Sequence, residues 1–399
     1  MDLDNNDIIC NKFKKHADCY YINDIYHIFN SSIDSKKYNK ILSSFINNFL
    51  FIVSMILSYF LLLFNLFFEY KIDYNNKIAI ARVYRTKVKI SRVHKNIQFI
   101  EDDIKNYDFT IYRIGPKLYR FKFLINSYFK LCIRDFRRVK EILNDEDINF
   151  SQKILFRIAK RIPHTIVYYN SMEYIMSNYN LLDIYTGQMR DRFALIEERL
   201  SNKYKKRLIC IPHGIESTKD MPVGYIGDVF YCSSPQMASK LNILYKTSKF
   251  TFNDEITSRM YRNNRKNQYV DRNKKVVFFT QPKDIKFTKK IIFIIAQYLK
   301  SKNEKLYIKV HPLERKSDYL IENTEIINSF EEAIFGNLCI SLSSTVLLEA
   351  LYNDSLSLSI IYLVNDVFEL TGDNQFLNDT RILKPQDKVA LFKIIDEFL

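Results

Sequence analysis

The sequence predicts an α/β protein of two domains, each built on a parallel β-sheet, and three observations support this. The chain has 399 residues, more than one ordinary core needs and enough for two domains with an appendage. Short apolar runs with the spacing of strands alternate with longer amphipathic segments, which is the pattern of βαβ units. The polar stretch 259–275, rich in Arg, Asn and Lys, interrupts the alternation and predicts an interdomain linker.

The chain is strongly basic, with a net charge of +15. Such a charge suits an acidic partner, whether nucleic acid, an anionic membrane surface, or a phosphorylated or carboxylated substrate. The sequence has no zinc-finger spacing and no Gly/aromatic RNA-binding signature, so we expect no nucleic-acid partner. The six cysteines are scattered without a CxxC pair, which predicts buried free thiols in a reducing cytosol.

An apolar segment at 41–72 follows a polar leader at 1–40. Its densest part, Phe49 to Phe68, has no charged residue, and about 20 helical residues match the thickness of a bilayer core. A helix that spans or enters the membrane is one interpretation, and a buried helix of the first domain is the other. Lys and Arg flank the segment on both sides, which best fits an interfacial helix with both ends in the cytoplasm.

The first domain, at 73–262, is expected to be the acceptor-side domain. Its expected strands cover 77–85, 97–102, 107–114, 164–170, 182–188, 206–214 and 228–234. Its expected helices cover 118–143, 154–162, 171–180, 191–204 and 234–244.

The second domain, at 263–399, is expected to bind a nucleotide. Its expected strands cover 275–282, 305–312, 324–328, 337–345 and 357–363. Its expected helices cover 288–301, 329–336, 346–353 and 384–398, the last being a terminal helix. Two α/β domains, a linker and a terminal helix have the outline of the GT-B architecture, in which two Rossmann-like domains face a cleft.

Two polar clusters fall at the ends of strands in the second domain, where an open parallel sheet binds its ligands. Ser343, Ser344 and Thr345 stand between a strand and a helix, where hydroxyls and free N–H groups collect a phosphate. The alternative is that a serine only caps the helix. His311 and Pro312 end another strand, and this histidine can donate to a phosphate and stabilise its departure.

These residues carry a resemblance that extends over 275–362. KVHP followed by SLSSTVLLEAL resembles the HP and Ser/Ser-Thr motifs of bacterial GT-B sialyltransferases and polysialyltransferases, and those of the related capsule Kdo transferases. FFTQP resembles the opening strand and loop of their C-terminal domains. The resemblance implies that residues of these motifs bind the phosphate and nucleoside of a CMP-sugar: Thr280, Gln281, His311, Pro312, Ser343, Ser344 and Thr345. It also implies that Glu349 binds the ribose hydroxyls, and the alternative is that Glu349 is exposed to solvent.

The general base is harder to place, because those sialyltransferases carry an acidic tripeptide that this sequence lacks. Asp191 follows a glycine turn after a predicted strand and is the favoured base, although it can equally cap its helix. His213, in Pro-His-Gly, is the other base candidate, since similar turns lie in the cleft of CDP-glycerol-type transferases; a structural turn histidine is the alternative.

The sequence therefore predicts an inverting glycosyltransferase that moves sialic acid, Kdo or a similar acidic sugar from CMP to a glycan or glycolipid. Capsule or lipooligosaccharide synthesis at the inner face of the cell membrane suits this activity. No cofactor or metal is expected, because Asp102-Asp103 and Glu331-Glu332 are interpreted as solvated charge. One alternative is transfer of a polyol phosphate from a donor such as CDP-glycerol, although Leu342 replaces the acidic residue usual in those enzymes. The others are transfer from a UDP-sugar and a non-catalytic membrane-associated scaffold of capsule assembly.

Overall fold

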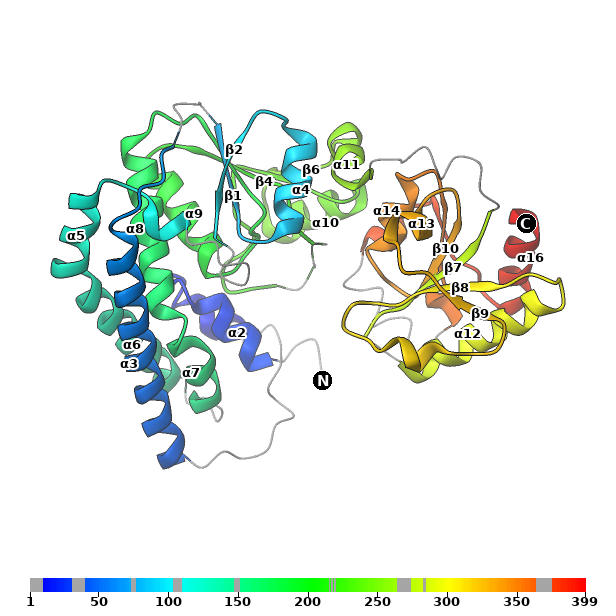
Figure 1. The fold of residues 1–399 in the computed structure, drawn as a ribbon, viewed down its shortest axis with the longest axis horizontal. Helices are drawn as coiled ribbons and strands as arrows, with labels where there is room; N and C mark the ends of the chain where they lie inside the picture. Colours follow the sequence, from blue (N-terminus) through cyan, green and yellow to red (C-terminus); the bar gives the residue numbers. More distant parts are fainter. Residues whose placement is uncertain are drawn as a thin grey trace. The chain divides into compact units, whose positions relative to one another are not determined.

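A computed structural model describes residues 10–30, 40–72, 77–102, 110–146, 151–214, 216, 218, 220–263, 274–282, 285–363 and 375–399 (Figure 1). The chain divides into two compact units. The first unit comprises Met1–His213 and Asp220–Phe230, and the second comprises Gly214–Lys219 and Tyr231–Leu399. The second unit thus includes residues 231–261, whereas the sequence analysis drew the boundary after residue 262.

The first sheet has six strands in the order β2-β1-β3-β4-β5-β6. They are β1 Lys77–Ala81, β2 Gln98–Glu101, β3 Asp183–Thr186, β4 Arg207–Cys210, β5 Val229–Tyr231 and β6 Phe250–Thr251. Strands β1 to β5 pair in parallel, as expected for apolar runs that are buried on both faces. Because β1 lies between β2 and β3, the winding of the sheet reverses between β1 and β3.

The helices of the first unit gather mainly beside this sheet, where Figure 1 shows α3, α5, α6, α7 and α8 together. The helices are α2 Ile22–Asn30, α3 Lys40–Asn65, α4 Tyr84–Val93, α5 Lys117–Asn126, α6 Tyr128–Asp145, α7 Ser151–Ala159, α8 Ile162–Asn178 and α9 Arg192–Lys203. The predicted apolar helix is confirmed as α3, and one side of it packs on α7 and α8. Its segment Phe45–Asn65, of mean hydropathy 2.1, is long and apolar enough to cross a membrane.

Three predictions for the first unit were wrong. The expected strand 164–170 lies inside α8, which begins with a proline in its first turn and is buried around most of its circumference. The expected helix 118–143 is two helices, α5 and α6, which meet at Ser127. The expected strand 107–114 is a 3-10 turn over its described part, Thr110–Arg113, and its beginning lies outside the described residues.

The second sheet has the parallel order β12-β11-β10-β7-β8-β9. Its strands are β7 Val276–Phe279, β8 Leu306–Lys309, β9 Thr324–Ile326, β10 Leu338–Ser341, β11 Leu356–Ser359 and β12 Ile382–Leu383. Its helices include α12 Ile285–Lys300, α13 Phe330–Ile334, α14 Val346–Leu351 and α16 Lys388–Phe398. Counted from β7, this is the 3-2-1-4-5-6 order of the Rossmann fold, whose winding reverses between β7 and β10. All five predicted strands are present, and β12 was not predicted.

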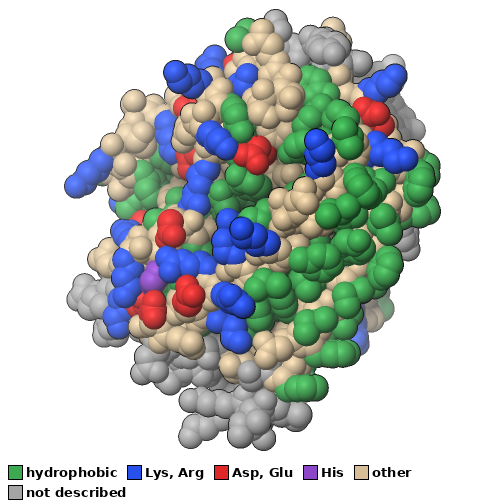
Figure 2. Space-filling model, turned by 90° about the vertical axis from the view of Figure 1, so that its left-hand side faces the viewer, with side chains coloured by type: hydrophobic (Ala, Val, Ile, Leu, Met, Phe, Trp, Pro, Cys, Tyr) green, Lys and Arg blue, Asp and Glu red, His purple; other side chains and the backbone are tan. Residues whose placement is uncertain are grey.

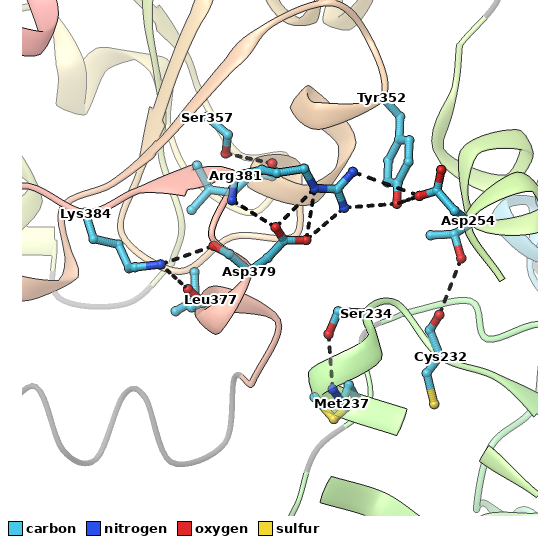
Figure 3. A network of polar contacts seen from close by, with 12 residues as sticks. Cys232, Ser234, Met237, Asp254, Tyr352, Ser357, Leu377, Asp379, Arg381 and Lys384 are labelled. Carbon is cyan, nitrogen blue, oxygen red and sulfur yellow. Dashed lines mark hydrogen bonds and ion pairs between the residues drawn. The ribbon is translucent and has the colours of Figure 1, made fainter. Parts of the chain in front are cut away.

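Residues 231–263 join the second sheet through helix α11, Asp254–Tyr261, which follows α10, Pro235–Tyr245, and β6. The Tyr352 hydroxyl donates to the Asp254 carboxylate at 3.1 Å (Figure 3). Arg381, which is paired with Asp379 at 2.8 Å, also donates to that hydroxyl. The Asn353 amide donates to the carbonyl of Tyr261 at 3.0 Å. These contacts explain why α11 clusters with the second unit.

The predicted fold class, two Rossmann-like α/β domains of the GT-B type with an apolar helix near the N-terminus, is confirmed by these two sheets and by α3. That the two domains face a common cleft stays a prediction. All six cysteines lie in the described ranges, and each is a buried thiol that forms no disulfide, as expected.

Candidate functional site

The candidate site lies at the carboxyl ends of β7, β8 and β10, beside the reversal point of the second sheet. The loop after β7 carries Thr280 and Gln281, the loop after β8 carries His311, and the loop after β10 carries Ser343 and Ser344. In an open α/β sheet, ligands bind at this place because the loops diverge there and leave backbone donors uncovered. The structure thus brings the strand-end residues predicted from the sequence to one edge of one sheet.

Thr280 holds the loops after β7 and β8 together. It is almost fully buried, and its hydroxyl donates to Glu314 Oε2 at 2.6 Å. Thr280 Oγ1 in turn accepts the backbone N–H of His311 at 2.9 Å. The buried Tyr319 hydroxyl donates to the other carboxylate oxygen of Glu314. The single hydrogen of the Thr280 hydroxyl is used by Glu314, so the residue positions His311, and a direct contact of Thr280 with a nucleotide stays a prediction.

His311 presents a hydrogen-bond donor from its free ring edge. Its Nδ1 accepts the backbone N–H of Leu313 at 3.2 Å, so in the neutral ring this nitrogen carries no hydrogen. The hydrogen is then on Nε2, which can donate to an anion. The side chain is half-buried, so an incoming ligand can reach it. A fixed N–H donor at a strand end is what binding of a phosphate oxygen requires.

Gln281 and Ser343 connect the loops on the two sides of the reversal point. The amide nitrogen of Gln281 donates to Ser343 Oγ at 3.3 Å, and the backbone N–H of Ser343 donates to the Gln281 amide oxygen at 3.2 Å. Two residues before Ser343, the buried Ser341 hydroxyl donates to the carbonyl of Phe279 at 2.9 Å. Because Ser343 Oγ accepts from Gln281, its own hydrogen remains available to a ligand.

The remaining residues predicted for this site make fewer contacts that would fix a role in binding. Ser344 Oγ accepts the N–H of Val346, the first residue of α14, at 3.4 Å, although the N-cap position itself is Thr345. Thr345 precedes α14 and makes no side-chain cap bond. Glu349 lies half-buried on α14. Burial raises the pKa of Tyr261, and the nearby charge of Glu349 adds to the rise. Pro312 is exposed directly after His311.

Lys309, the last residue of β8 and two residues before His311, donates to the carbonyl of Asn328. Burial lowers the pKa of this lysine, and Lys316 lowers it further. The lysine therefore contacts the segment after β9, and not the loops after β7 and β10.

In the first unit, the neutral ring of His213 carries its hydrogen on Nδ1, whereas that of His311 carries it on Nε2. Its Nδ1 lies 2.8 Å from the carbonyl oxygen of Gly187, which can only accept, so Nδ1 carries the hydrogen. Nε2 of the neutral ring then has a free lone pair, as a general base requires. Gly187 itself must be glycine, because a Cβ there would lie 2.4 Å from Thr86 Cγ2 on α4.

Asp191 begins α9 as its N-cap. Its Oδ1 accepts the backbone N–H groups of Phe193 at 3.2 Å and of Ala194 at 2.9 Å, which is the capping alternative. Burial raises the pKa of the Asp191 carboxyl, and the nearby Asp24 adds to the rise. Asp191 therefore has a structural function, and its assignment as the base stays a prediction.

A buried polar cluster at the ends of β1 and β2 was missed. Asp102, interpreted as solvated charge, is only 2% exposed, and Asp103 lies outside the described residues. Asp102 Oδ2 is bound by Arg82 Nε at 2.8 Å and lies 3.0 Å from His164 Nε2. Burial alone would raise the pKa of Asp102, but His164 and Arg82 hold it below its usual value. Arg82, a basic residue directly after the apolar strand β1, was the feature of the sequence that could have predicted this ion pair.

Within the described ranges, no three His, Cys, Asp or Glu side chains are grouped so that they could hold a metal ion. A metal-independent reaction stays a prediction.

Comparison with known proteins found a similar solved structure but no matching sequence family. No protein-family model matches the chain, and no curated protein matches it. The solved structure of UDP-N-acetylglucosamine 2-epimerase from Rickettsia bellii is similar to 81% of this chain and covers 87% of its own, at 12% sequence identity and a TM-score of 0.38. At this distance the likeness concerns the fold alone, so the site must be judged from its own geometry.

Proposed function

We propose that the chain is a glycosyltransferase whose second unit binds a nucleotide-activated sugar at the carboxyl edge of its sheet. One observation carries the proposal: at the reversal point of a Rossmann sheet, the Gln281–Ser343 bridge and His311 Nε2–H stand at adjacent strand ends. Dinucleotides and nucleotide-sugars share a phosphate-bearing nucleoside that such an edge accommodates. A scaffold protein would not need uncommitted donors there.

The phosphate is the part of the donor that these residues suit. His311 supplies a ring N–H, and Ser343 and Ser344 supply hydroxyl hydrogens that their observed contacts leave available. In the transfer, the acceptor oxygen bonds to the anomeric carbon while the bond from that carbon to the phosphate oxygen breaks. The electron pair leaves with the nucleotide, and the three donors stabilise the charge that develops on its phosphate.

A CMP-activated acidic sugar, of the sialic acid or Kdo type, is the donor we favour. Support comes from the KVHP and SLSST resemblance and from the net charge of +15, which suits an acidic donor. Leu342, only 1% exposed, stands where CDP-glycerol transferases have an acidic residue, so polyol-phosphate transfer is disfavoured. The acceptor is proposed to be a glycan or glycolipid assembled at the inner face of the cell membrane.

For the general base, the contacts favour His213 over Asp191. The ring of His213 has a free lone pair at Nε2, whereas Asp191 already accepts two helix N–H bonds. The acceptor proton would pass to Nε2 of His213 as the new bond forms. Replacement of His213 by Gln should abolish turnover without changing nucleotide binding, whereas Asp191→Asn, which still caps α9, should retain most of the turnover.

The nucleotide itself is tested by thermal unfolding of the purified protein with CMP, CDP, UDP and GDP. A nucleotide at a hundred times its Kd should stabilise the fold by about 2.7 kcal/mol. We expect CMP to stabilise most, and His311→Ala and Ser343→Ala each to lose most of this effect. The exposed His27 on α2 gives the matched control His27→Ala, which should respond like the unchanged protein. Equal stabilisation of His311→Ala by CMP would refute the site, and a preference for UDP would refute the donor.

A further inference from the structure

The outer side of α3 is an apolar face. Asn47 and Asn65, which temper the hydropathy of this helix, are both buried on its inner side. The outer side exposes large apolar side chains at every third or fourth position. They are Phe45, Phe49, Ile52, Ile56, Phe60, Leu63 and, just past the helix, Phe67, with Leu57 and Phe64 beside them. Soluble monomers seldom expose so long a row of large apolar groups.

Two neighbouring helices extend this face. On α5, Leu118, Phe121 and Ile125 are exposed at the spacing of one helix side, and on α6 Phe129 and Ile133 are exposed. Helix α5 packs on both α3 and α6. Figure 2 views the side on which these helices lie and shows a continuous band of hydrophobic side chains there. We call the exposed apolar residues of α3, α5 and α6 the apolar band.

Basic side chains accompany the apolar band. Lys130, Arg134 and Arg137 are exposed on α6 at positions four and three residues apart, next to Phe129 and Ile133. Figure 2 shows Lys and Arg along one border of the band. These three line a cavity of about 600 Å³ beside α6, together with the carboxylates of Asp18, Asp135 and Glu141. Arg134 is paired with Asp135, but in the described ranges neither Lys130 nor Arg137 has a carboxylate within ion-pair distance.

Helix α3 is held lengthwise against its unit. Near its start, the Asn47 amide donates to Gln152 of α7 at 2.9 Å. In its middle, the Tyr128 hydroxyl donates to the carbonyl of Met55 at 2.8 Å. At its end, the buried Arg120 donates to the carbonyl of Asn65 at 2.6 Å. If α3 crossed a bilayer in this arrangement, its polar and charged partners would enter the hydrocarbon, which is costly.

We propose that the first unit binds an anionic phospholipid surface through the apolar band, with α3 lying in the plane of the membrane. The large apolar groups enter the boundary between headgroups and acyl chains, and Lys130 and Arg137 meet lipid phosphates. A row of cations beside a Phe- and Leu-rich band matches the chemistry of such a surface. The proposal does not depend on the transferase activity.

Vesicle co-sedimentation of the full chain tests the surface. Vesicles of phosphatidylcholine are compared with vesicles that also contain phosphatidylglycerol. The double variant Leu57→Glu/Phe64→Glu should lose binding to both by at least about tenfold. The variant Lys130→Glu/Arg137→Glu should lose the preference for the anionic vesicles, at roughly fivefold per basic residue. The matched control is Ile243→Glu on α10, an apolar residue that is 71% exposed, and it should bind normally.

The orientation of α3 is tested by fluorescence, because the chain contains no tryptophan. Phe49→Trp, Phe60→Trp and Phe67→Trp each introduce a single fluorophore, and the outer two lie about 27 Å apart along a helix. Lipids that carry quenchers at known depths should give three similar, shallow depths, about 5–10 Å below the headgroups. A deep fluorophore in Phe60→Trp, with shallow ones in the other two variants, would show a spanning helix and overturn the proposal. A chain that ignores vesicles, and forms a dimer which Leu57→Glu/Phe64→Glu dissociates, would overturn it in favour of a protein interface.

Discussion

Glu197 on α9 offers the sharpest test of the packing beneath the first sheet. Its side chain is fully buried, and the Tyr168 hydroxyl donates to its Oε1. Burial is the main cause that raises the pKa of Glu197 from 4.5 to about 8. The carboxyl is therefore protonated in the folded protein at neutral pH, although it ionises in the unfolded chain. Glu197→Gln replaces it with a neutral group of the same shape.

The sign and size of the effect follow from linkage. A carboxyl whose folded pKa is raised stabilises the fold fully below the unfolded pKa of 4.5, and this contribution is lost as the pH rises towards about 8. Each pH unit in that window is worth about 1.4 kcal/mol. Relative to the native protein, Glu197→Gln should therefore gain less than about 1 kcal/mol near pH 5 and roughly 3 kcal/mol near pH 7. The gain should stop growing above the folded pKa.

Urea unfolding followed by circular dichroism at several pH values measures this gain. The half-buried Glu198, one residue further along α9, provides the control Glu198→Gln, measured at the same pH values. A gain for Glu197→Gln that is the same at acid and neutral pH would contradict the buried, protonated carboxyl. A loss of stability that grows as the pH rises would show that the carboxyl is instead needed as an anion.

Three further changes test other parts of the fold. Thr280→Val should cost the second unit roughly 2–3 kcal/mol in urea unfolding and weaken its nucleotide response, because two buried hydrogen bonds are lost; Thr280→Ser should restore both. Gly187→Ala should lower the melting temperature through its clash with Thr86, and adding Thr86→Ala should recover part of the loss, whereas additive losses would exclude the clash. Arg120→Met should cost roughly 3 kcal/mol or more, because five backbone carbonyls lose their donor; a cost below about 1 kcal/mol would contradict this.

The second domain was predicted from sequence far better than the first. Its strands are short apolar runs that end in polar residues, and its terminal helix begins at the capping residue Asp387. Strand β12 escaped prediction because it has only two residues. Helix α8 was mistaken for a strand because it is buried around most of its circumference, which removes the helical period from the sequence. Its signal was Pro163, which is typical of a first helical turn.

For the candidate site, the sequence predicted which residues lie at the strand ends, but not which of them contact one another. Gln281 and Ser343 are 62 residues apart, and they meet because Val276 of β7 pairs with Leu338 of β10. Counting five residues onward along each strand brings both side chains to the same level. This register depends on the whole sheet, so no local pattern reveals it. The ring orientations of the two histidines likewise depend on backbone atoms that they contact only in the fold.

The lengthwise packing of α3 has a consequence for the order of synthesis. This helix leaves the ribosome before its partners α7 and α8, which begin at residues 151 and 162. At about 5–20 residues per second, translation delivers those partners roughly 5–20 s later. For that interval both sides of an apolar helix are uncovered, and cytosolic chaperones or membrane-targeting factors can bind them. The nascent chain can therefore reach the lipid surface before the first domain has folded.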